Sequence, residues 1–192
     1  MSIVHRNFIF IHIPKTAGTS IESIIGGSGH KSLSQIMKDG SDAFGHQVGD
    51  PPPPAVAFVR NPYDRMVSGY HFIRQVDYCE LPASFEKFVW WLRDQNPEQW
   101  SLRDYFEKKL EHFAPQHMFI DFDGFAGHTQ VYRFERLKED WKLFCERFMI
   151  VGELPHTQRS RHRSWRTYYD SATKAIVHEL YKTDFELFGY DL

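Results

Sequence analysis

The chain has 192 residues, of which 42% are hydrophobic, 16% aromatic and 25% charged. This composition excludes a disordered tail, a collagen and a coiled coil, and the length predicts a single domain over residues 1–192. The 23 Lys and Arg residues nearly balance the 25 Asp and Glu residues, and the formal net charge is −2. Bulk nucleic-acid binding usually requires a basic excess, so this balance argues against it and leaves room only for a local anion site.

The cellular location is predicted from what the chain lacks. The two cysteines, Cys79 and Cys145, are too few for a disulfide framework or a cysteine metal motif. The longest apolar runs, 8–11 and 55–59, are far shorter than the roughly 20 residues that span a bilayer. The first run is interrupted at once by polar residues and a proline, which is unlike a secretory signal. We expect no membrane contact and a cytoplasmic protein, with a truncated lumenal domain as the alternative.

The first predicted elements are a strand and a helix joined by a short turn. Asn7–Ile13 is β-branched and aromatic, which predicts a buried strand. Isoleucines at helical spacing then predict a helix over 19–25, with Thr19 or Ser20 as its N-cap. One further short helix is expected near Ser34–Lys38.

A second strand and helix follow in the same order. The continuous apolar run Ala55–Val59 is typical of a central strand covered on both faces. A helix then begins with Asn61 as N-cap and Pro62 in the first helical position. The apolar face of this helix consists of Met66, Val67, Tyr70 and Ile73.

The later elements are mostly helical. Two helices are predicted over Ser84–Arg93 and Leu102–His112, and a third over Glu135–Phe148. A hairpin is predicted from Met118–Asp121 and Gln130–Phe134. The last helix is expected to start at Asp170 or Ser171, to end at Gly189, and to present a stripe of Ala172, Ile176, Leu180 and Leu187. The two strand–turn–helix units predict an α/β fold, with a central parallel sheet flanked by helices on both faces.

The segment Ile13–Ser20, with the sequence IPKTAGTS, carries the first chemical signal. Its small residues let the backbone approach a ligand closely, and N–H groups at a helix start favour an anion. Lys15 adds a positive charge. Hydroxyl donors are supplied by Thr16, Thr19 and Ser20. The pattern suits a phosphate or sulfate, but it is not a Walker A loop, because Lys15 precedes Gly18 instead of following the last glycine. An ordinary turn with a solvated lysine is the alternative.

The segment Arg60–Tyr70, with the sequence RNPYDRMVSGY, carries the second signal. Arg60 follows a predicted central strand, and open α/β sheets bind ligands at the carboxyl ends of their strands. Its guanidinium can hold a phosphate with two hydrogen bonds, and the hydroxyl of Ser68 can add another. Arg65 is also near. The alternative is that Arg60 only ends the strand and Ser68 is a small packing residue.

Together, HIPKTAGTS and FVRNPYDRMVSGY resemble the sulfotransferases that use 3′-phosphoadenosine 5′-phosphosulfate (PAPS) as donor. The likeness is closest to the carbohydrate branch that includes the heparan sulfate 2-O- and 6-O-sulfotransferases and their bacterial relatives. It extends in weaker form from Phe8 to Tyr190. The weaker segments are His112–Gln116, Tyr132–Leu137, Leu154–Thr157 and the YKTDFELFGY stretch near the C-terminus. The resemblance implies a P-loop-like fold and PAPS as donor. No metal is expected, because the leaving group departs as a stable phosphate.

The resemblance also implies which residues hold the donor. In this family the first loop binds the 5′-phosphosulfate, and the Arg and Ser of the second motif bind the 3′-phosphate. By position, the 5′ side is assigned to Lys15, Thr16, Ala17, Gly18, Thr19 and Ser20, and the 3′ side to Arg60 and Ser68. The basic run Arg159–Arg166 precedes the last predicted helix, where family members often close over the donor's phosphates. Arg161 and Arg163 are therefore candidates, with a solvated basic face as the alternative.

The catalytic base is assigned by a shorter match. FGHQV, at 44–48, looks like the segment that carries the base in the 2-O-sulfotransferase, so His46 is predicted to take this role. Glu22, one turn into the first predicted helix, is the second candidate. His12, at a strand end, is expected to be a core histidine.

The predicted function is transfer of a sulfuryl group from PAPS to a hydroxyl, or less favourably an amine, of a carbohydrate acceptor. Lys15 would stabilise the charge on the leaving phosphate, and His46 would accept the proton. The alternatives are a nucleotide kinase with a degenerate phosphate loop and a nucleotide-binding module without catalysis. The sequence does not identify the acceptor or the oligomeric state.

Overall fold

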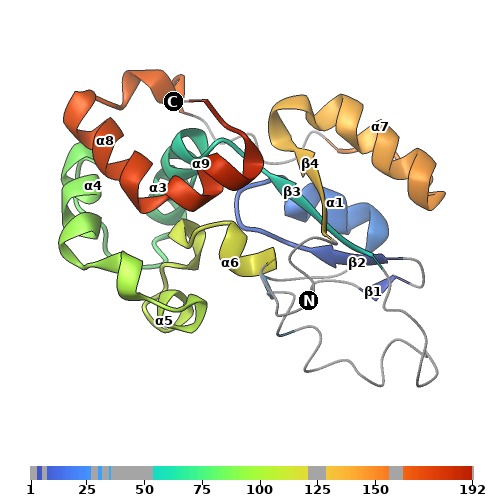
Figure 1. The fold of residues 1–192 in the computed structure, drawn as a ribbon, viewed down its shortest axis with the longest axis horizontal. Helices are drawn as coiled ribbons and strands as arrows, with labels where there is room; N and C mark the ends of the chain where they lie inside the picture. Colours follow the sequence, from blue (N-terminus) through green and yellow to red (C-terminus); the bar gives the residue numbers. More distant parts are fainter. Residues whose placement is uncertain are drawn as a thin grey trace. The chain divides into compact units, whose positions relative to one another are not determined.

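The computed structural model describes residues 4–5, 8–26, 30–31, 35, 54–120, 129–155 and 162–191, and the chain forms two compact units. Unit 1 comprises Met1–Val59 and Phe119–Thr157, and unit 2 comprises Arg60–Met118 and Gln158–Leu192. Each unit is thus built from two separate stretches of chain, as the colours in Figure 1 show. The single domain expected over 1–192 stays a prediction.

Unit 1 is organised around a four-stranded sheet with the order β1-β2-β3-β4. Its strands are β1 (Val4–His5), β2 (Phe8–Ile11), β3 (Ala55–Val59) and β4 (Thr129–Arg133). The short β1 pairs antiparallel with β2, whereas β2, β3 and β4 are parallel neighbours. The predicted α/β class, with a central parallel sheet, is confirmed.

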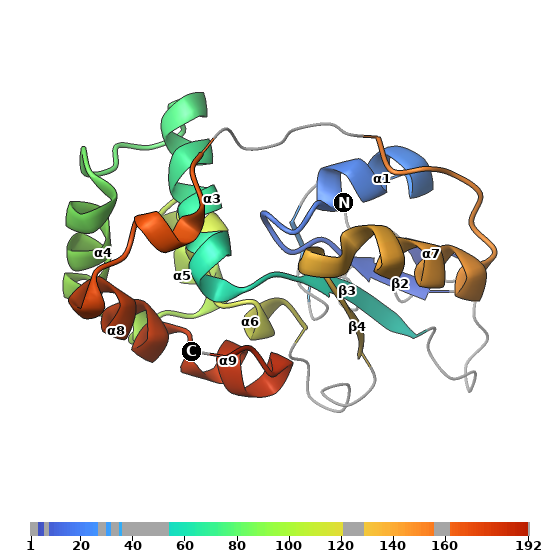
Figure 2. The ribbon, with the colours of Figure 1, turned by 90° about the horizontal axis from the view of Figure 1, so that it is seen from above.

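The core of unit 1 lies between the sheet and the helices α1 (Gly18–Ile25) and α7 (Leu137–Phe148). Alternate strand residues face these helices, because side chains along a strand point to opposite faces. The buried cluster consists of Phe8, Phe10, Ile21, Val56, Phe58, Tyr132, Trp141, Phe144 and Phe148. Figure 2 shows α1 and α7 over the same side of the strands. Ile9, Ile11 and Ala57, on the opposite face, are also fully buried, so both faces of the sheet are covered.

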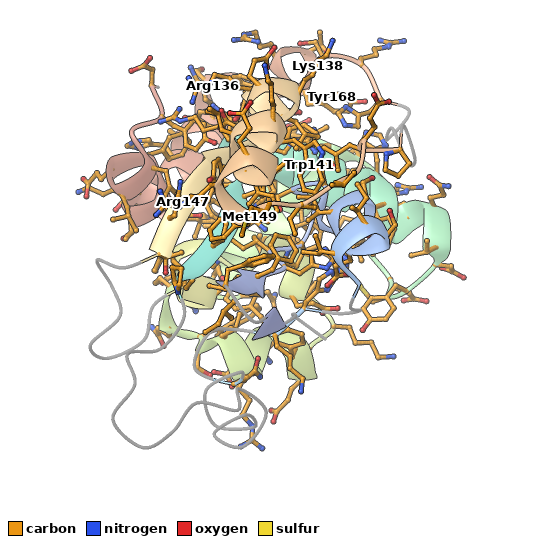
Figure 3. All side chains as sticks on the ribbon, turned by 90° about the vertical axis from the view of Figure 1, so that its right-hand side faces the viewer. Arg136, Lys138, Trp141, Arg147, Met149 and Tyr168 are labelled. Atoms are coloured by element: carbon orange, nitrogen blue, oxygen red, sulfur yellow. The ribbon has the colours of Figure 1, made fainter. Side chains whose placement is uncertain are left out.

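Helix α7 combines a buried face with an exposed, charged one. Trp141 packs in the core, and its indole N–H donates to the Gly152 carbonyl at 3.0 Å. Arg136 lies at the start of the helix, whereas Arg147 and Met149 lie at its other end (Figure 3). Met149 ends the helix in a left-handed conformation, with φ of 54°. The helix begins after a 3-10 turn over Phe134–Arg136, two residues later than predicted.

The predicted hairpin is wrong. Met118–Asp121 does not pair with Gln130–Phe134, because His117–Ile120 forms the short helix α6 and β4 pairs in parallel with β3 instead. A short apolar run does not distinguish a strand from a buried helical turn, and this ambiguity produced the error. The short helix expected near Ser34–Lys38 lies outside the described residues, except for Gln35.

Unit 2 is helical. Its α-helices include α3 (Pro62–Val76), α4 (Phe85–Asp94), α5 (Leu102–Glu107), α8 (Ser171–Leu180) and α9 (Lys182–Phe188). Side chains cap the N-termini of α3, α4, α5 and α8, and these caps are Asn61, Ser84, Ser101 and Asp170. The start of α3 at Asn61-Pro62 is therefore confirmed, as is the burial of its predicted apolar face.

Two helix predictions in unit 2 need correction. The helix expected over Leu102–His112 ends at Glu107, and Glu111–Phe113 forms a separate 3-10 turn. The last predicted helix is two helices, because Tyr181 leaves the helical conformation with φ of −118° and ψ of 22°. The buried stripe consists of Thr173, Val177, Tyr181, Phe185 and Phe188, one position later than expected. Leu187, expected in the stripe, is 59% exposed.

Two further findings concern membrane-spanning helices and the cysteines. Within the described residues, no helix has both the length and the apolar character needed to cross a bilayer. Cys79 and Cys145 are both free thiols. Burial raises the pKa of each thiol above its ordinary value, which disfavours the reactive thiolate.

Candidate active site

The loop between β2 and α1 has an unusual backbone. Lys15 and Ala17 both adopt left-handed conformations, with φ of 69° and 71°. Such conformations cost a non-glycine residue of the order of 1–3 kcal/mol each and cluster at functional sites. Between them, Thr16 is 1% exposed and its hydroxyl donates to the Ile13 carbonyl at 2.9 Å. Left-handed residues in a turn are one way in which successive N–H groups form a concavity that binds anions.

Helix α1 begins without the features that usually complete a helix start. Its N-cap is Ala17, which makes no side-chain capping hydrogen bond, so the predicted cap at Thr19 or Ser20 is wrong. The first turn also holds no acidic residue. Thr19 is exposed, whereas Ser20 is buried. The first N–H groups of a helix have no intrahelical partner and carry partial positive charge, so this start is suited to an anion.

Gly18 is required where the loop meets the helix. A Cβ atom at this position would lie 1.9 Å from Cδ2 of His12, so no other residue fits without moving the ring. His12 is 4% exposed, and its Nδ1 lies 2.9 Å from Oε2 of Glu22. His12 is therefore buried beneath the loop, as expected. Glu22, the second candidate base, has a side chain that is 6% exposed and is directed at this histidine.

In unit 2, Arg60 is held at both its backbone and its guanidinium. Its N–H donates to Oε1 of Gln116, and its carbonyl accepts from Nε2 of the same amide, both at 2.9 Å. Its Nε and Nη2 each lie 2.9 Å from Oδ2 of Asp64, one turn along the chain. Arg60 is 6% exposed, and the ion pair with Asp64 fixes one edge of the guanidinium.

The first turns of α3 place the other residues of the second motif. The Asn61 side chain accepts hydrogen bonds from the N–H groups of Tyr63 and Asp64, which fixes where the helix begins. Ser68 is four residues beyond Asp64, so the two lie on neighbouring turns of one helix side. Ser68 is 1% exposed.

Arg65, which the sequence placed near this site, has a different set of contacts. Its Nη1 donates to the His112 carbonyl at 3.2 Å, and its Nη2 donates to the Ala114 carbonyl. Its guanidinium also lies 5.8 Å from the Tyr181 ring centre. Complete burial lowers the pKa of Arg65, although the phenol of Tyr181 and the carboxylate of Asp184 oppose that shift. These contacts assign Arg65 to the interior of unit 2.

Of three further residues predicted from the family resemblance, only one belongs to the part of the chain that the structure describes. His46 and Arg161 lie outside the described residues. Arg163 is described and exposed, just before the 3-10 turn Trp165–Thr167. Its neighbour His162 stacks on His71 of α3, with ring centres 5.5 Å apart and planes inclined by 14°.

The residues that sequence reasoning missed are Gln116 and Asp184. Both are 0% exposed, and Asp184 accepts from the N–H groups of Gln116 and His117 at 2.7 and 2.9 Å. The signal that could have found them was present in the HFAPQ and YKTD segments, which the resemblance covered without giving them a role.

A family model described as "Sulfotransferase family" matches residues 4–191. The chain therefore belongs to the sulfotransferase family. No curated protein sequence matches the chain. The crystal structure of a sulfotransferase from Alicyclobacillus acidocaldarius is similar, with 15% identity, a TM-score of 0.47, and coverage of 99% of this chain and 98% of that chain.

Proposed function

We propose that this sulfotransferase moves a sulfuryl group from PAPS to a hydroxyl of a carbohydrate. Family membership supports sulfuryl transfer, and the residues present suit the donor. The observation that carries the proposal is the loop before α1, where the left-handed Lys15 and Ala17 lead into a helix start with no side-chain cap. A backbone arranged in this way favours the 5′-phosphosulfate of the donor.

The reaction is an in-line displacement at sulfur. The acceptor oxygen forms a new bond to the sulfur while the bond from sulfur to the 5′-phosphate oxygen breaks, and 3′-phosphoadenosine 5′-phosphate leaves. Negative charge therefore grows on the 5′-phosphate. Lys15 and the N–H groups of Thr16, Ala17, Gly18, Thr19 and Ser20 are proposed to stabilise it. Fixed donors of this kind contribute roughly 2.7–4 kcal/mol each in other enzymes.

The 3′-phosphate is assigned to Arg60 and Ser68, with Arg161 or Arg163 as further contacts. Arg60 supports this role because its backbone and one edge of its guanidinium are both held, as a rigid phosphate ligand requires. A guanidinium fixed before binding loses less conformational entropy when the phosphate arrives.

The acceptor's proton is assigned to His46, with Glu22 as the rival base. The pairing of Glu22 with His12 favours His46, because a buried carboxylate that faces a histidine is less accessible to an acceptor. No sugar-binding residue is assigned, and the acceptor class rests on the family resemblance.

A comparison of nucleotides tests the donor. We expect 3′-phosphoadenosine 5′-phosphate to raise the melting temperature without magnesium, and ADP to raise it much less. Ligand at about 100 times its Kd would add about 2.7 kcal/mol of stability. Arg60→Ala should remove most of this difference, whereas Arg163→Ala should remove it only if Arg163 contacts the donor. Equal shifts with both nucleotides, or a need for magnesium, would favour a nucleotide kinase instead.

A second comparison tests the base. His46→Ala should bind 3′-phosphoadenosine 5′-phosphate as wild type does and lose about 10²–10⁴ in turnover. Glu22→Gln is the matched control. Loss of turnover in Glu22→Gln with normal turnover in His46→Ala would move the role to Glu22. Donor binding with no turnover on any carbohydrate would leave a nucleotide-binding module.

A further inference from the structure

Hydrogen bonds link Arg60 to two segments that have no assigned role in the proposed donor site. Gln116 ends the HFAPQ segment, and Asp184 belongs to α9 in the YKTD segment. Both lie in unit 2 with Arg60. The backbone of Arg60 is bonded to the Gln116 amide, and that amide is bonded in turn to Asp184. The three residues form one chain of hydrogen bonds inside the unit.

The Gln116 amide holds Arg60 as a neighbouring strand would. It accepts from the Arg60 N–H and donates to the Arg60 carbonyl, so both backbone groups of this residue are satisfied by one side chain. Val59, the residue before Arg60, ends β3, and Asn61 caps α3. Arg60 is thus the single residue between a strand and a helix cap, and Gln116 supplies the hydrogen bonds that neither provides.

Asp184 fixes the orientation of that amide. Its Oδ2 accepts from the Gln116 N–H at 2.7 Å and from Nε2 at 3.4 Å. Its Oδ1 accepts from the His117 N–H at 2.9 Å and lies 2.7 Å from Nδ1 of His117. An ionised carboxylate only accepts hydrogen bonds, so the NH₂ group of Gln116 must face Asp184 and its oxygen must face the Arg60 N–H. The amide therefore has one satisfied orientation.

We propose that Gln116, oriented by Asp184, is a positioning residue that sets the selectivity of the enzyme for a nucleotide with a 3′-phosphate. This inference rests on the proposed function, in which Arg60 binds that phosphate. Asp64 fixes the guanidinium and Gln116 fixes the backbone, so the side chain is held at both ends. Loss of the Gln116 hydrogen bonds would free the backbone end and weaken only the contact that Arg60 makes.

The structure offers a matched control in the same unit. The Tyr181 hydroxyl donates to the Phe113 carbonyl, which holds the loop before Gln116 at a point three residues away from that amide. Tyr181→Phe removes one buried hydrogen bond and leaves the Gln116 amide in place. It therefore reports the effect of weakening the loop in general, whereas Gln116→Met, of similar length and without hydrogen bonds, reports the effect on Arg60.

The experiment compares 3′-phosphoadenosine 5′-phosphate with adenosine 5′-phosphate, which lacks only the 3′-phosphate, by titration calorimetry. We expect Gln116→Met to lower the preference for the first nucleotide by about tenfold, the effect of weakening one charge-assisted hydrogen bond, while Tyr181→Phe keeps it. Affinity for adenosine 5′-phosphate should not change. Amide hydrogen exchange at Arg60 should accelerate in Gln116→Met alone.

Gln116→Glu gives a second, reversible version of the test. It keeps an acceptor for the Arg60 N–H but places a carboxylate beside Asp184 at neutral pH. A buried carboxyl beside a like charge has a raised pKa, so it takes up a proton and regains a donor as the pH falls from about 8 to about 6. The preference of this variant relative to wild type should recover over that range, which loss of folding alone would not produce.

The outcomes separate the two proposals. A wild-type preference that survives in both Gln116→Met and Gln116→Glu overturns the positioning role and leaves the proposed donor intact. A wild-type protein with no preference for the 3′-phosphate overturns the donor assignment and the inference with it. Equal losses in Gln116→Met and Tyr181→Phe would show that the loop as a whole matters and would overturn the specific role of Gln116.

Discussion

The two inner strands of the sheet, β2 and β3, each lead into a helix, and the two passages are held in different ways. After β2, the loop to α1 contains two left-handed residues and ends at a helix start with no side-chain cap. After β3, Asn61 caps α3 and Gln116 satisfies the backbone of Arg60. The first passage places backbone N–H groups at a helix start suited to an anion, whereas the second uses its hydrogen bonds internally and offers a side chain.

This difference explains why the two motifs have such different compositions. A loop that binds through its backbone needs small residues and close approach, as in KTAG. A turn that binds through one arginine needs its backbone fixed, and so it needs a cap, a proline and a buried amide partner. In the proposed function, one strand–turn–helix pattern would therefore bind phosphate groups by two physical means.

The largest expected effect is on kcat and comes from Lys15. In the first passage, this residue supplies a positive charge beside the backbone N–H groups. Lys15→Met should lower kcat by about 10²–10³ because it removes one fixed donor from the leaving phosphate. Single-turnover rates with a carbohydrate acceptor measure this loss. Lys15→Arg is the control that keeps the charge, and an equal loss in both variants would point to geometry instead of charge.

The next effect comes from the close contact at Gly18. Gly18→Ala places a Cβ atom against the His12 ring and should destabilise unit 1 by about 1–3 kcal/mol while weakening nucleotide binding. Gly69→Ala in α3 is the matched control, since its Cβ would lie 3.0 Å from the Phe113 ring. Urea unfolding and calorimetry measure the two effects. Equal outcomes for the two glycines would remove the special role of the loop.

A smaller effect is expected where the second passage begins. Asn61→Ala removes the cap of α3 and should cost about 0.5–2 kcal/mol of stability. Asn61→Asp keeps an acceptor for the same N–H groups and should retain most of that stability. Urea unfolding measures both. Because the first passage has no side-chain cap, no substitution of Thr19 or Ser20 should give a comparable loss through capping.

The smallest effect is a dependence of stability on pH at the far end of α3. Burial, then the nearby His162 and Arg74, lower the pKa of His71. The unfolded chain then binds a proton at His71 more readily than the folded chain, so stability should fall as the pH drops through about 6.5. Urea midpoints against pH measure this slope. His71→Phe keeps a ring beside His162 and Tyr168 and should flatten it, and an unchanged slope would exclude His71 as its source.

The sequence was sufficient where one local signal decided the structure. The apolar run Ala55–Val59 and the Asn61-Pro62 helix start were predicted at their observed bounds, because continuous burial and an N-cap are both local properties. The hairpin failed because the partner of β4 is β3, which is distant in sequence and leaves no local mark. The last helix failed because packing moved the buried residues one position from the expected stripe.

In the proposed site, too, some features follow from local sequence signals and others do not. The proposed donor residues, in the loop before α1 and at Arg60, were predicted from motifs, since their types and spacing are read directly from the chain, and their role stays a prediction. The left-handed backbone, the His12 contact with Gly18 and the Gln116–Asp184 pair were not, because each depends on the backbone conformation or on how side chains meet in three dimensions. The pairing of Glu22 with His12 likewise required coordinates, although the two residues are only ten positions apart.

Unit 2 is built from two separate stretches of chain, and this determines when, during synthesis, the hydrogen bonds around Arg60 can form. Gln116 and Asp184 are separated by 68 positions, and both lie later in the chain than Arg60. A ribosome releases Arg60 long before it releases α9, so a nascent chain has the arginine and its amide partner without the carboxylate that orients them. Selectivity for the donor would therefore be acquired late in synthesis, after every residue of unit 1 has emerged. Proteolytic trimming that reaches α9 would return a finished enzyme to that immature state.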